Sequence, residues 1–357
     1  MSVRIAIVGT GAIAGVHAEA LEGIPRAKIV AVTDTDHRRL DPFGERTGAA
    51  RYPTLADLLS REKPDLVHVC TPPAAHYGAG LECLRAGVSV LIEKPPVISL
   101  RELDGLAAAQ GPRTWFGTVF QHRFGSGQAR LKRLMRAGVL GRPLLAICHT
   151  TWFRDQAYFD VPWRGDWETE GGGPTMGHGI HQMDMLADVL GDWAEVSALA
   201  RTQARQTRTE DLSLAHVTFA SGAVASVVNS VLSPREESYL RFDFERATVE
   251  VTHLYGYGDG SWRITPAPGY DNVITATSEV SERNTDSGHA AQFRDVLAAM
   301  RDDLPIPVTA GETRRTMTLI AGIYASAFTR RPVTPEDLGP DTPFYGAMNG
   351  GMTAPWQ

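Results

Sequence analysis

The sequence predicts an α/β protein of two domains with different sheet types. Over about the first 120 residues, strand-like and helix-like segments alternate, which is typical of a parallel sheet with right-handed crossovers. Between residues 194 and 251, strand-like segments follow one another with short turns, which predicts antiparallel pairing with one covered face. We therefore expect a first domain at 1–122, a second at 123–333, and a Pro- and Gly-rich tail at 334–357.

The elements of the first region are bounded by Gly, Pro and Asp residues. A β-branched run at 4–8 and a second at 28–33 predict strands, and the stretch after Gly11 predicts a helix. Further strands are expected at 65–70, 88–92 and 115–120, and helices at 55–60, 76–86 and 100–109.

The second region opens with a helix and a strand. Its later apolar segments alternate with polar residues and are separated by turn residues such as those at 220–222. Helices are expected at 127–137, 178–190, 289–302 and 311–330, and strands at 143–150, 195–204, 211–219, 223–230, 239–244 and 248–253.

Composition excludes several classes of protein. The chain is 43% hydrophobic and 21% charged, as in soluble globular proteins, and its net charge of −6 does not favour nucleic acid or an anionic membrane. No apolar run approaches the ~20 residues that cross a bilayer, and the short first strand does not resemble a signal peptide. Cys70, Cys83 and Cys148 show no metal or disulfide spacing, so we expect a reducing cytoplasm.

The first strand ends in Gly9-Thr10-Gly11-Ala12-Ile13-Ala14. The pattern Gly-x-Gly-x-x-Ala between a strand and a helix gives a tight turn, close backbone approach to a pyrophosphate and an anion-binding helix N-terminus. It predicts a dinucleotide site whose contacts come from Gly9, Thr10, Gly11, Ala12 and Ile13. The alternative is an ordinary turn followed by a capped helix.

Asp34 follows Gly9 by 25 residues and ends the second strand-like run. An acidic residue at about this spacing accepts the ribose hydroxyls of NAD and repels the 2′-phosphate of NADP. NAD is therefore the expected cofactor, although Arg38 and Arg39 offer charges that a 2′-phosphate could use.

Several further motifs resemble the glucose–fructose oxidoreductase/inositol dehydrogenase (Gfo/Idh/MocA) family. They occur in one order over residues 3–333 and include Val-x-Val-x-Thr-Pro-Pro-x-x-His at 67–76, Glu93-Lys94-Pro95, Gln121-x-Arg123-Phe124, Gly-Gly-Gly at 171–173 and Gly179-x-His181-x-x-Asp184. The resemblance implies a Rossmann domain followed by an α/β domain with a large, open, mostly antiparallel sheet. It also implies NAD(P)-linked redox chemistry on sugars, inositols or related polyols, and assembly as dimers or tetramers through the outer sheet face.

By the same resemblance, Lys94 is a catalytic residue that contacts both substrate and cofactor, whereas a surface lysine beside a proline turn is the alternative. Glu93 is expected to support the cofactor pocket, and Pro95 to fix the turn in a conformation, cis or trans, that the sequence does not decide. The remaining cofactor contacts are expected from Thr71, Pro72, His76 and Gln121, with a helix-capping role as the alternative for His76.

His181 is the expected acid/base residue, because an imidazole titrates near neutral pH. The alternative is a hydrogen-bonded core histidine. Family members often carry Asp four residues before this histidine, where this chain has Gly177, so the carboxylate is either absent or supplied elsewhere. His178 is expected to contact substrate from the same helix, three residues from His181. Asp184 would either orient the imidazole or serve helix packing.

A polar and aromatic set is expected to bind substrate, because aromatic faces and Arg side chains suit sugar rings and carboxylates. A salt-bridged loop with Trp anchors is the alternative. His289, at the start of a late helix, is expected to face the active-site cleft. The His and acidic residues show no zinc spacing, so no metal is assigned. The substrate-binding set comprises Arg123, Trp152, Arg154, Trp163 and Arg164, with Asp166 nearby.

The sequence thus predicts an NAD(P)-dependent dehydrogenase of a sugar or polyol that forms a homo-oligomer. A catalytically silent, cofactor-binding regulator on the same fold and an NAD-dependent glycosidase remain the alternatives.

Overall fold

The computed structural model describes residues 2–279 and 284–356, which form two compact units. The first unit extends to Val119 and also contains His289–Thr313, and the second contains Phe120–Gly288 and the chain from Arg314 onward. The boundary lies close to the expected one, but the return of 289–313 to the first unit was not expected. The predicted second domain at 123–333 is therefore interrupted.

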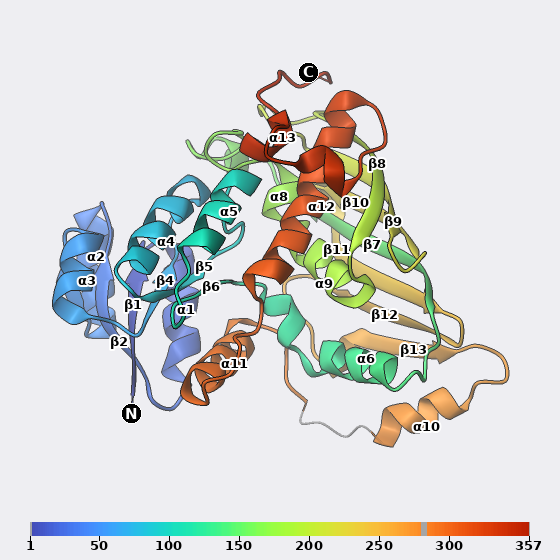
Figure 1. Cartoon of the computed structure of the whole chain (residues 1–357), viewed down its shortest axis with the longest axis horizontal. Helices are drawn as coiled ribbons and strands as arrows, with labels where there is room; N and C mark the ends of the chain where they lie inside the picture. Colours follow the sequence, from blue (N-terminus) through green and yellow to red (C-terminus); the bar gives the residue numbers. More distant parts are fainter. Residues whose placement is uncertain (1, 280–283, 357) are drawn as a thin grey trace. The chain divides into compact units, whose positions relative to one another are not determined.

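The first unit is built on a six-stranded parallel sheet of order β3-β2-β1-β4-β5-β6 (Figure 1). Its pairing confirms the expected alternation of strands and helices, but the three-residue β3 was not predicted. The strands are β1 (Val3–Val8), β2 (Ala27–Thr33), β3 (Ala50–Tyr52), β4 (Leu66–Val69), β5 (Ser89–Ile92) and β6 (Phe116–Thr118).

The helices of the first unit begin at side-chain caps in several cases. Thr54 accepts a hydrogen bond from the Asp57 amide, and Ser99 accepts one from the Glu102 amide. The helices are α1 (Ala12–Glu22), α2 (His37–Thr47), α3 (Leu55–Glu62), α4 (His76–Arg85), α5 (Leu100–Ala109) and α11 (His289–Arg301), with a 3-10 turn η1 (Pro73–Ala75).

Helix α11 belongs to the first unit because its apolar face completes a hydrophobic core there. Phe293, Val296 and Leu297 pack with Ile5 of β1 and Leu21 of α1. Burial of such side chains stabilises a fold by roughly 1.5–3 kcal/mol each, which accounts for the return of the chain.

The second unit contains a seven-stranded sheet of order β13-β12-β11-β7-β10-β9-β8. All neighbouring strands are antiparallel except β7 and β10, which pair in parallel, so the expected mostly antiparallel sheet is confirmed. The strands are β7 (Pro143–Phe153), β8 (Trp193–Arg201), β9 (Leu212–Phe219), β10 (Val224–Ser230), β11 (Leu232–Phe244), β12 (Ala247–His253) and β13 (Trp262–Pro266).

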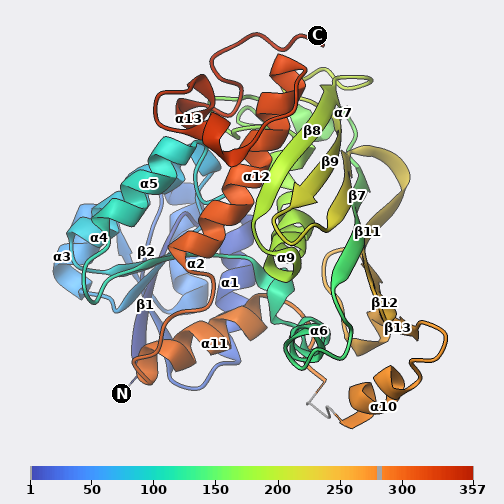
Figure 2. The ribbon, with the colours of Figure 1, turned by 45° about the vertical axis from the view of Figure 1, so that its right-hand side comes forward.

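Helices α8 and α9 pack on one face of this sheet, against strands β7, β9, β10 and β11, and Figure 2 shows α9 and α12 on the same side. The further elements are α6 (Ser126–Arg136), α7 (Gln156–Phe159), α8 (Pro174–Gly177), α9 (Ile180–Leu190), α10 (Asn272–Glu279), α12 (Ala310–Thr329) and α13 (Pro343–Gly346), with 3-10 turns η2 (Gln121–Phe124), η3 (Asp259–Ser261) and η4 (Pro335–Leu338).

The expected helix at 178–190 is wrong at its start. Helix α8 ends at Gly177, His178 has φ −120° and ψ −54°, and α9 begins only after Gly179. A Cβ at residue 179 would collide with the side-chain amide of Asn229, so glycine is required at this close approach. His178 therefore lies at a joint between two helices and not on the face of one helix with His181.

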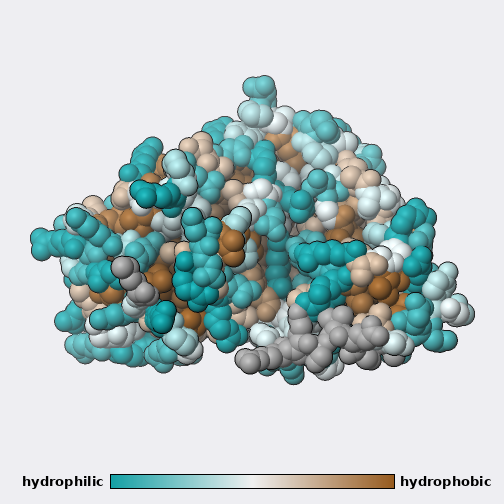
Figure 3. Space-filling model, turned by 60° about the horizontal axis from the view of Figure 1, so that its bottom comes forward, coloured by the Kyte–Doolittle hydropathy of each residue, from teal (hydrophilic) through white to brown (hydrophobic). Residues whose placement is uncertain are grey.

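The Pro- and Gly-rich tail is folded against the second unit. Phe344 and Trp356 both pack edge-on or tilted against Phe328 of α12, and Leu338 and Met348 are buried. On the face drawn in Figure 3, hydrophilic residues cover most of the surface and hydrophobic residues form smaller areas between them. Among the described residues, every helix is too short or too polar to span a membrane.

Candidate active site

The glycine turn leaves the start of α1 open. A Cβ on Gly9, whose φ is +84°, would lie 2.9 Å from the backbone of Cys70, so only glycine fits. Gly11 is the N-cap of α1; no side chain caps the helix, and a Cβ there would meet no atom within 4 Å. The amides at this end are thus available to an anion, and the turn fits a dinucleotide pyrophosphate.

Asp34 lies beside this turn at the end of β2. Its Oδ2 accepts hydrogen bonds from the Thr10 amide (2.7 Å) and hydroxyl (3.0 Å), and its Oδ1 accepts one from the Asp36 amide (2.8 Å). Burial alone would raise the pKa of Asp34, but these hydrogen bonds outweigh it and hold the pKa below its usual value. The side chain is therefore a fixed anion beside the glycine turn.

The two arginines that could bind a 2′-phosphate are drawn to acidic partners. Arg38 donates from Nε and Nη2 to Asp36 at 3.1 Å each, and Arg39 lies 3.5 Å from Asp34. Both guanidinium groups are largely exposed, so these pairs are weak, and the two arginines balance the charges of Asp34 and Asp36.

His76 joins the two turns that follow β4 and β5. Its Nδ1 lies 2.7 Å from the Pro95 carbonyl oxygen, and its Nε2 lies 2.7 Å from that of Thr71. Both ring nitrogens are thereby engaged with the backbone, which favours a supporting role over the expected cofactor contact. The Lys94–Pro95 peptide bond is cis. The Thr71 hydroxyl is buried without a hydrogen-bond partner among the described residues, as expected for a group that awaits a ligand.

Glu93 points into the first unit. Its Oε1 lies 2.9 Å from Nε2 of His17 on α1 and 3.3 Å from Nε2 of His289 on α11. Burial alone would raise the pKa of Glu93, but the hydrogen bonds from the two histidines outweigh it and lower the pKa well below its usual value. Glu93 thus links α1, α11 and the turn that carries Lys94, and its expected supporting role remains a prediction.

His17, Glu93 and His289 are also the set of described residues that could hold a metal, since their ligand atoms lie within 4.8 Å of one another. His17 extends the group through its Nδ1, which lies 2.9 Å from Nδ1 of His68. Hydrogen bonds account for all of these short distances, so the geometry alone gives no reason to place an ion here.

In the second unit, the glycine triplet is held by Glu210 and Tyr324. Glu210 is fully buried and accepts hydrogen bonds from the Gly173 amide (3.1 Å), the Thr175 amide (3.1 Å) and the Tyr324 hydroxyl (2.9 Å). A Cβ on Gly172 would collide with the Tyr324 hydroxyl, which is why the motif is glycine at this position. These contacts fix the start of α8 and hence the segment that leads to His178 and His181.

His181 is the second residue of α9 and is buried. Its ring stacks on that of His122, with a centroid distance of 4.3 Å and an interplanar angle of 18°. Gln182 Nε2 lies 3.3 Å from Nδ1 of His122 and 3.2 Å from Nε2 of His253, and burial lowers the pKa of His253 to about 4. His181 therefore faces a group of histidines that the sequence motifs did not indicate.

His178 lies among aromatic rings, 5.1 Å from Trp152 and 5.5 Å from Tyr158 between ring centroids. Arg154 covers both of these aromatic rings, and its Nη1 lies 2.9 Å from Glu236. The predicted polar and aromatic set, apart from Arg123, is thus brought together in this region. The Arg residues have carboxylate partners, as in the salt-bridged alternative, so the substrate role of Trp152 and Arg154 stays a prediction.

Arg164 lies 3.9 Å from the ring centroid of Tyr158 and 4.2 Å from that of Trp163. It also hydrogen-bonds the Tyr158 hydroxyl, and its Nη1 lies 3.1 Å from Oε1 of the buried Glu170. Asp166, by contrast, pairs with the exposed Arg208 at 2.5 Å.

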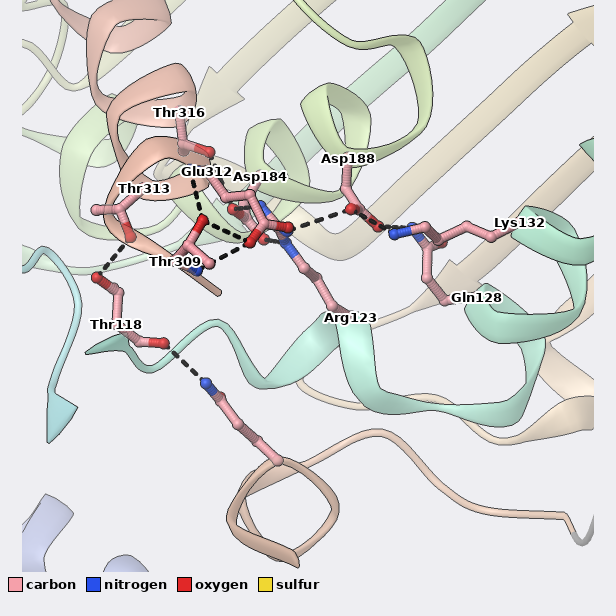
Figure 4. Close-up of polar contacts among 11 residues, drawn as sticks. Thr118, Arg123, Gln128, Lys132, Asp184, Asp188, Thr309, Glu312, Thr313 and Thr316 are labelled. Carbon is pink, nitrogen blue, oxygen red and sulfur yellow. Dashed lines mark hydrogen bonds and ion pairs between the residues drawn. The ribbon is translucent and has the colours of Figure 1, made fainter. Parts of the chain in front are cut away.

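Arg123, which is expected to bind substrate, has carboxylate partners in the structure, so its substrate role stays a prediction. Its guanidinium is buried and donates to both oxygens of Asp184, at 2.5 and 2.6 Å, and to Asp188 at 3.2 Å (Figure 4). Asp184 also accepts a hydrogen bond from the Thr316 hydroxyl at 2.9 Å. These contacts of Asp184 with η2 and α12 support its helix-packing role, and the orientation of the His181 ring by Asp184 stays a prediction. Burial raises the pKa of Asp184 to about 6, although Arg123 opposes the rise.

Gln121 in η2 is buried, and its Oε1 has no hydrogen-bond partner among the described residues. Its predicted cofactor contact therefore stays open. The residues that the sequence did not indicate are His17, His68, His122, Glu210 and His253. Each acts through partners that are remote in the chain, so no local spacing in the sequence indicates them.

Two family models match the chain. The model of an oxidoreductase family with an NAD-binding Rossmann fold matches residues 3–111, and that of the GFO/IDH/MocA C-terminal domain matches residues 128–252.

The chain is also similar to characterised proteins. It is 30% identical to D-glucoside 3-dehydrogenase of Escherichia coli over 72% of this chain and 80% of the relative. It is 28% identical to inositol 2-dehydrogenase of Rubrobacter xylanophilus over 71% and 72% of the two chains. The WlbA dehydrogenase from Bordetella pertussis, solved in complex with NADH and UDP-GlcNAcA, has a similar fold, with a TM-score of 0.83 and 25% identity over 94% of this chain and 99% of that protein.

Proposed function

The chain belongs to the GFO/IDH/MocA family of NAD-binding oxidoreductases, and we propose that it oxidises a secondary hydroxyl of a sugar, an inositol or a related polyol with NAD. The observation that carries the proposal is the uncapped glycine turn beside the fixed anion of Asp34. The named activities of the glucoside and inositol dehydrogenases support the substrate class.

Backbone amides at Gly11, Ala12 and Ile13 would hold the pyrophosphate, and Asp34 the ribose hydroxyls. The bound cofactor supplies the nicotinamide that accepts the hydride. Lys94, in the turn after β5, would contact the ribose and polarise the reacting oxygen. Its turn is fixed by His76, which bonds the Pro95 carbonyl, and by Glu93, which accepts from the Lys94 amide at 3.1 Å.

We assign the proton of the substrate hydroxyl to the imidazole of His181, with His178 as a substrate contact. Proton transfer to a positioned base accelerates such reactions by roughly 10²–10⁴-fold. The stack with His122 fixes the plane of the His181 ring, so the base is oriented before substrate binds.

A substrate panel tests the proposal directly. Purified protein with NAD is mixed with aldoses, methyl glucosides, inositols and nucleotide sugars, and NADH absorbance is followed. We expect turnover of at least one of them that rises with pH through a histidine-like pKa. NAD binding without turnover across the whole panel would instead indicate a cofactor-binding regulator.

Variants of the two histidines separate their roles. His181→Ala is expected to lower turnover at least ~100-fold, whereas His178→Ala mainly raises KM. Equal turnover in wild type and His181→Ala would move the proton chemistry to Lys94.

The outer face of the second sheet supports a homo-oligomer. Leu145, Leu199, Leu214 and Val224 lie on that face through the strand register and are each 38–46% exposed. Exposed apolar residues gathered on one sheet face are typically covered by a symmetric copy. Light scattering at micromolar concentration is expected to show a dimer or tetramer. Leu214→Arg is expected to dissociate it, with Leu304→Arg, at an exposed leucine outside the sheet, as the matched control.

The cysteines support a cytoplasmic location. Cys70, Cys83 and Cys148 are all unpaired and buried, and burial raises the pKa of Cys83 to about 12, which makes its thiol unreactive. A reducing compartment would preserve this state.

A further inference from the structure

Glu170 places a buried carboxylate at the joint between α8 and α9. It precedes the glycine triplet, and only 4% of its surface is exposed. Its Oε2 accepts a hydrogen bond from the Gly165 amide at 2.7 Å, and its Oε1 lies 3.1 Å from Nη1 of Arg164. The loop from 163 to 170 thus folds around its own last side chain.

The same carboxylate borders Gly177. A Cβ built on Gly177 would lie 3.5 Å from Glu170 Oε1, which is ordinary van der Waals contact. A short acidic side chain on residue 177 would therefore bring its oxygens into the space that Glu170 occupies. The chain lacks an acidic residue at 177 and carries one at 170, and the two positions converge.

The charge of Glu170 acts on the surroundings of His178. Arg164, Tyr158 and His178 contact one another in series from Glu170. Burial raises the pKa of Tyr158, and the negative charge of Glu170 raises it further. A buried ion pair is weak evidence of stabilisation, because apolar residues often replace one at no cost. Its position at this joint therefore calls for another explanation.

We propose that Glu170 is the positioning residue of the histidine site, supplying from the loop the negative charge that Gly177 cannot carry. The inference rests on the proposed function for its catalytic meaning. When the substrate hydroxyl gives its proton to His181, the imidazole becomes a cation. A fixed negative charge in these surroundings favours the charged imidazole over the neutral one. Arg164 and the Gly165 amide hold the carboxylate in place.

A charge transplant tests the proposal. We would compare wild type, Glu170→Gln, Glu170→Gln with Gly177→Asp, and Glu170→Gln with Gly177→Asn. The first readout is NMR titration of the His178 and His181 rings with NAD present, with assignments from His178→Ala and His181→Ala. Glu170→Gln is expected to lower the titration midpoint of at least one ring by about one pH unit. Adding Gly177→Asp restores it, and adding the isosteric Gly177→Asn does not.

Turnover is the second readout, with methyl α-D-glucoside and myo-inositol as probes. Glu170→Gln is expected to lower kcat about 100-fold with little change in KM and to move the acidic limb of the pH profile to lower pH. Adding Gly177→Asp is expected to return kcat to within about tenfold of wild type. A purely structural Glu170 would not be rescued from residue 177.

The outcomes keep the two proposals apart. Unchanged midpoints for both histidines in Glu170→Gln would overturn the role of Glu170, whatever the substrate. So would equal midpoints in the Asp and Asn double variants. If the midpoints move as expected while wild type turns over neither probe, the charge assignment stands and the substrate class fails. Gly177→Asp alone sets two carboxylates side by side, so its repulsion is expected to lower stability.

Discussion

The glycine turn of the first unit and the joint between α8 and α9 in the second both prepare a site, but they are built differently. The turn uses contiguous backbone amides at residues 11–13, beside one carboxylate, Asp34. The joint depends on side chains from distant parts of the chain. Glu210 and Tyr324 of α12 hold the glycine triplet, and Glu170 holds the loop that precedes it. A site made of backbone amides can be recognised from a short sequence motif, whereas a site made of side chains depends on the whole fold.

The largest effect on stability is expected from a buried ion pair of the second unit. Arg123→Ala leaves the buried carboxylates of Asp184 and Asp188 without their shared cation and is expected to cost about 3–5 kcal/mol of unfolding free energy. Chemical denaturation measures the loss. Arg142→Ala removes a short but exposed pair with Glu245 and is expected to leave the free energy of unfolding nearly unchanged. Similar stability of the two variants would contradict the structural role of Arg123 and leave the predicted substrate role as its function.

Lys94→Ala is expected to act on turnover and not on folding, since the residue lies in a strand-end turn. We expect kcat to fall at least ~100-fold, the lower end of general acid–base effects, while the thermal unfolding midpoint stays near that of wild type. Lys28→Ala, at an exposed position of β2, is the control. Near-normal turnover in Lys94→Ala would remove this lysine from the mechanism.

A pH dependence of stability is expected from His253. Its pKa is about 4 in the folded state against 6.5 in the unfolded state, so the unfolded chain takes up its proton first. The contribution of His253 to the free energy of unfolding is complete above pH 6.5 and decreases as the pH falls toward 4. At pH 5 the expected loss is about 2 kcal/mol. Urea unfolding at pH 7.5 and 5 measures it. His253→Gln is expected to flatten the profile, whereas the exposed His216→Gln should not.

The smallest expected effect concerns cofactor choice in the first unit. We expect a dissociation constant for NAD at least about tenfold below that for NADP, because Asp34 repels a 2′-phosphate. Asp34→Ala is expected to reduce this preference, and Asp41→Ala on exposed α2 to leave it unchanged. Tighter binding of NADP than of NAD by the wild type would show that Arg38 and Arg39 dominate the ribose site.

The sequence predicted what local chemistry determines. Helix α5 occupies the expected 100–109, because Ser99 caps it and its apolar residues recur at helical spacing. Strand β13 was missed because it is a five-residue edge strand that ends in proline and alternates weakly in burial. Arg123 is predicted to bind substrate because Arg side chains suit sugar hydroxyls and carboxylates, but its ion pairs with Asp184 and Asp188 join residues 61 and 65 positions apart, which no sequence spacing indicates. No spacing rule connects Glu170 to Gly177, because the contact depends on how the loop folds.

The return of His289–Thr313 to the first unit delays completion of that unit during synthesis. A ribosome adds roughly 5–20 residues per second, so the segment 120–288 takes roughly 10–30 s to emerge after β6 is complete. Until Phe293 follows, Ile5, Leu21 and their neighbours lack the apolar face that covers them. The cofactor-binding unit is therefore the first to begin folding and is completed late, with part of its apolar core exposed in the meantime.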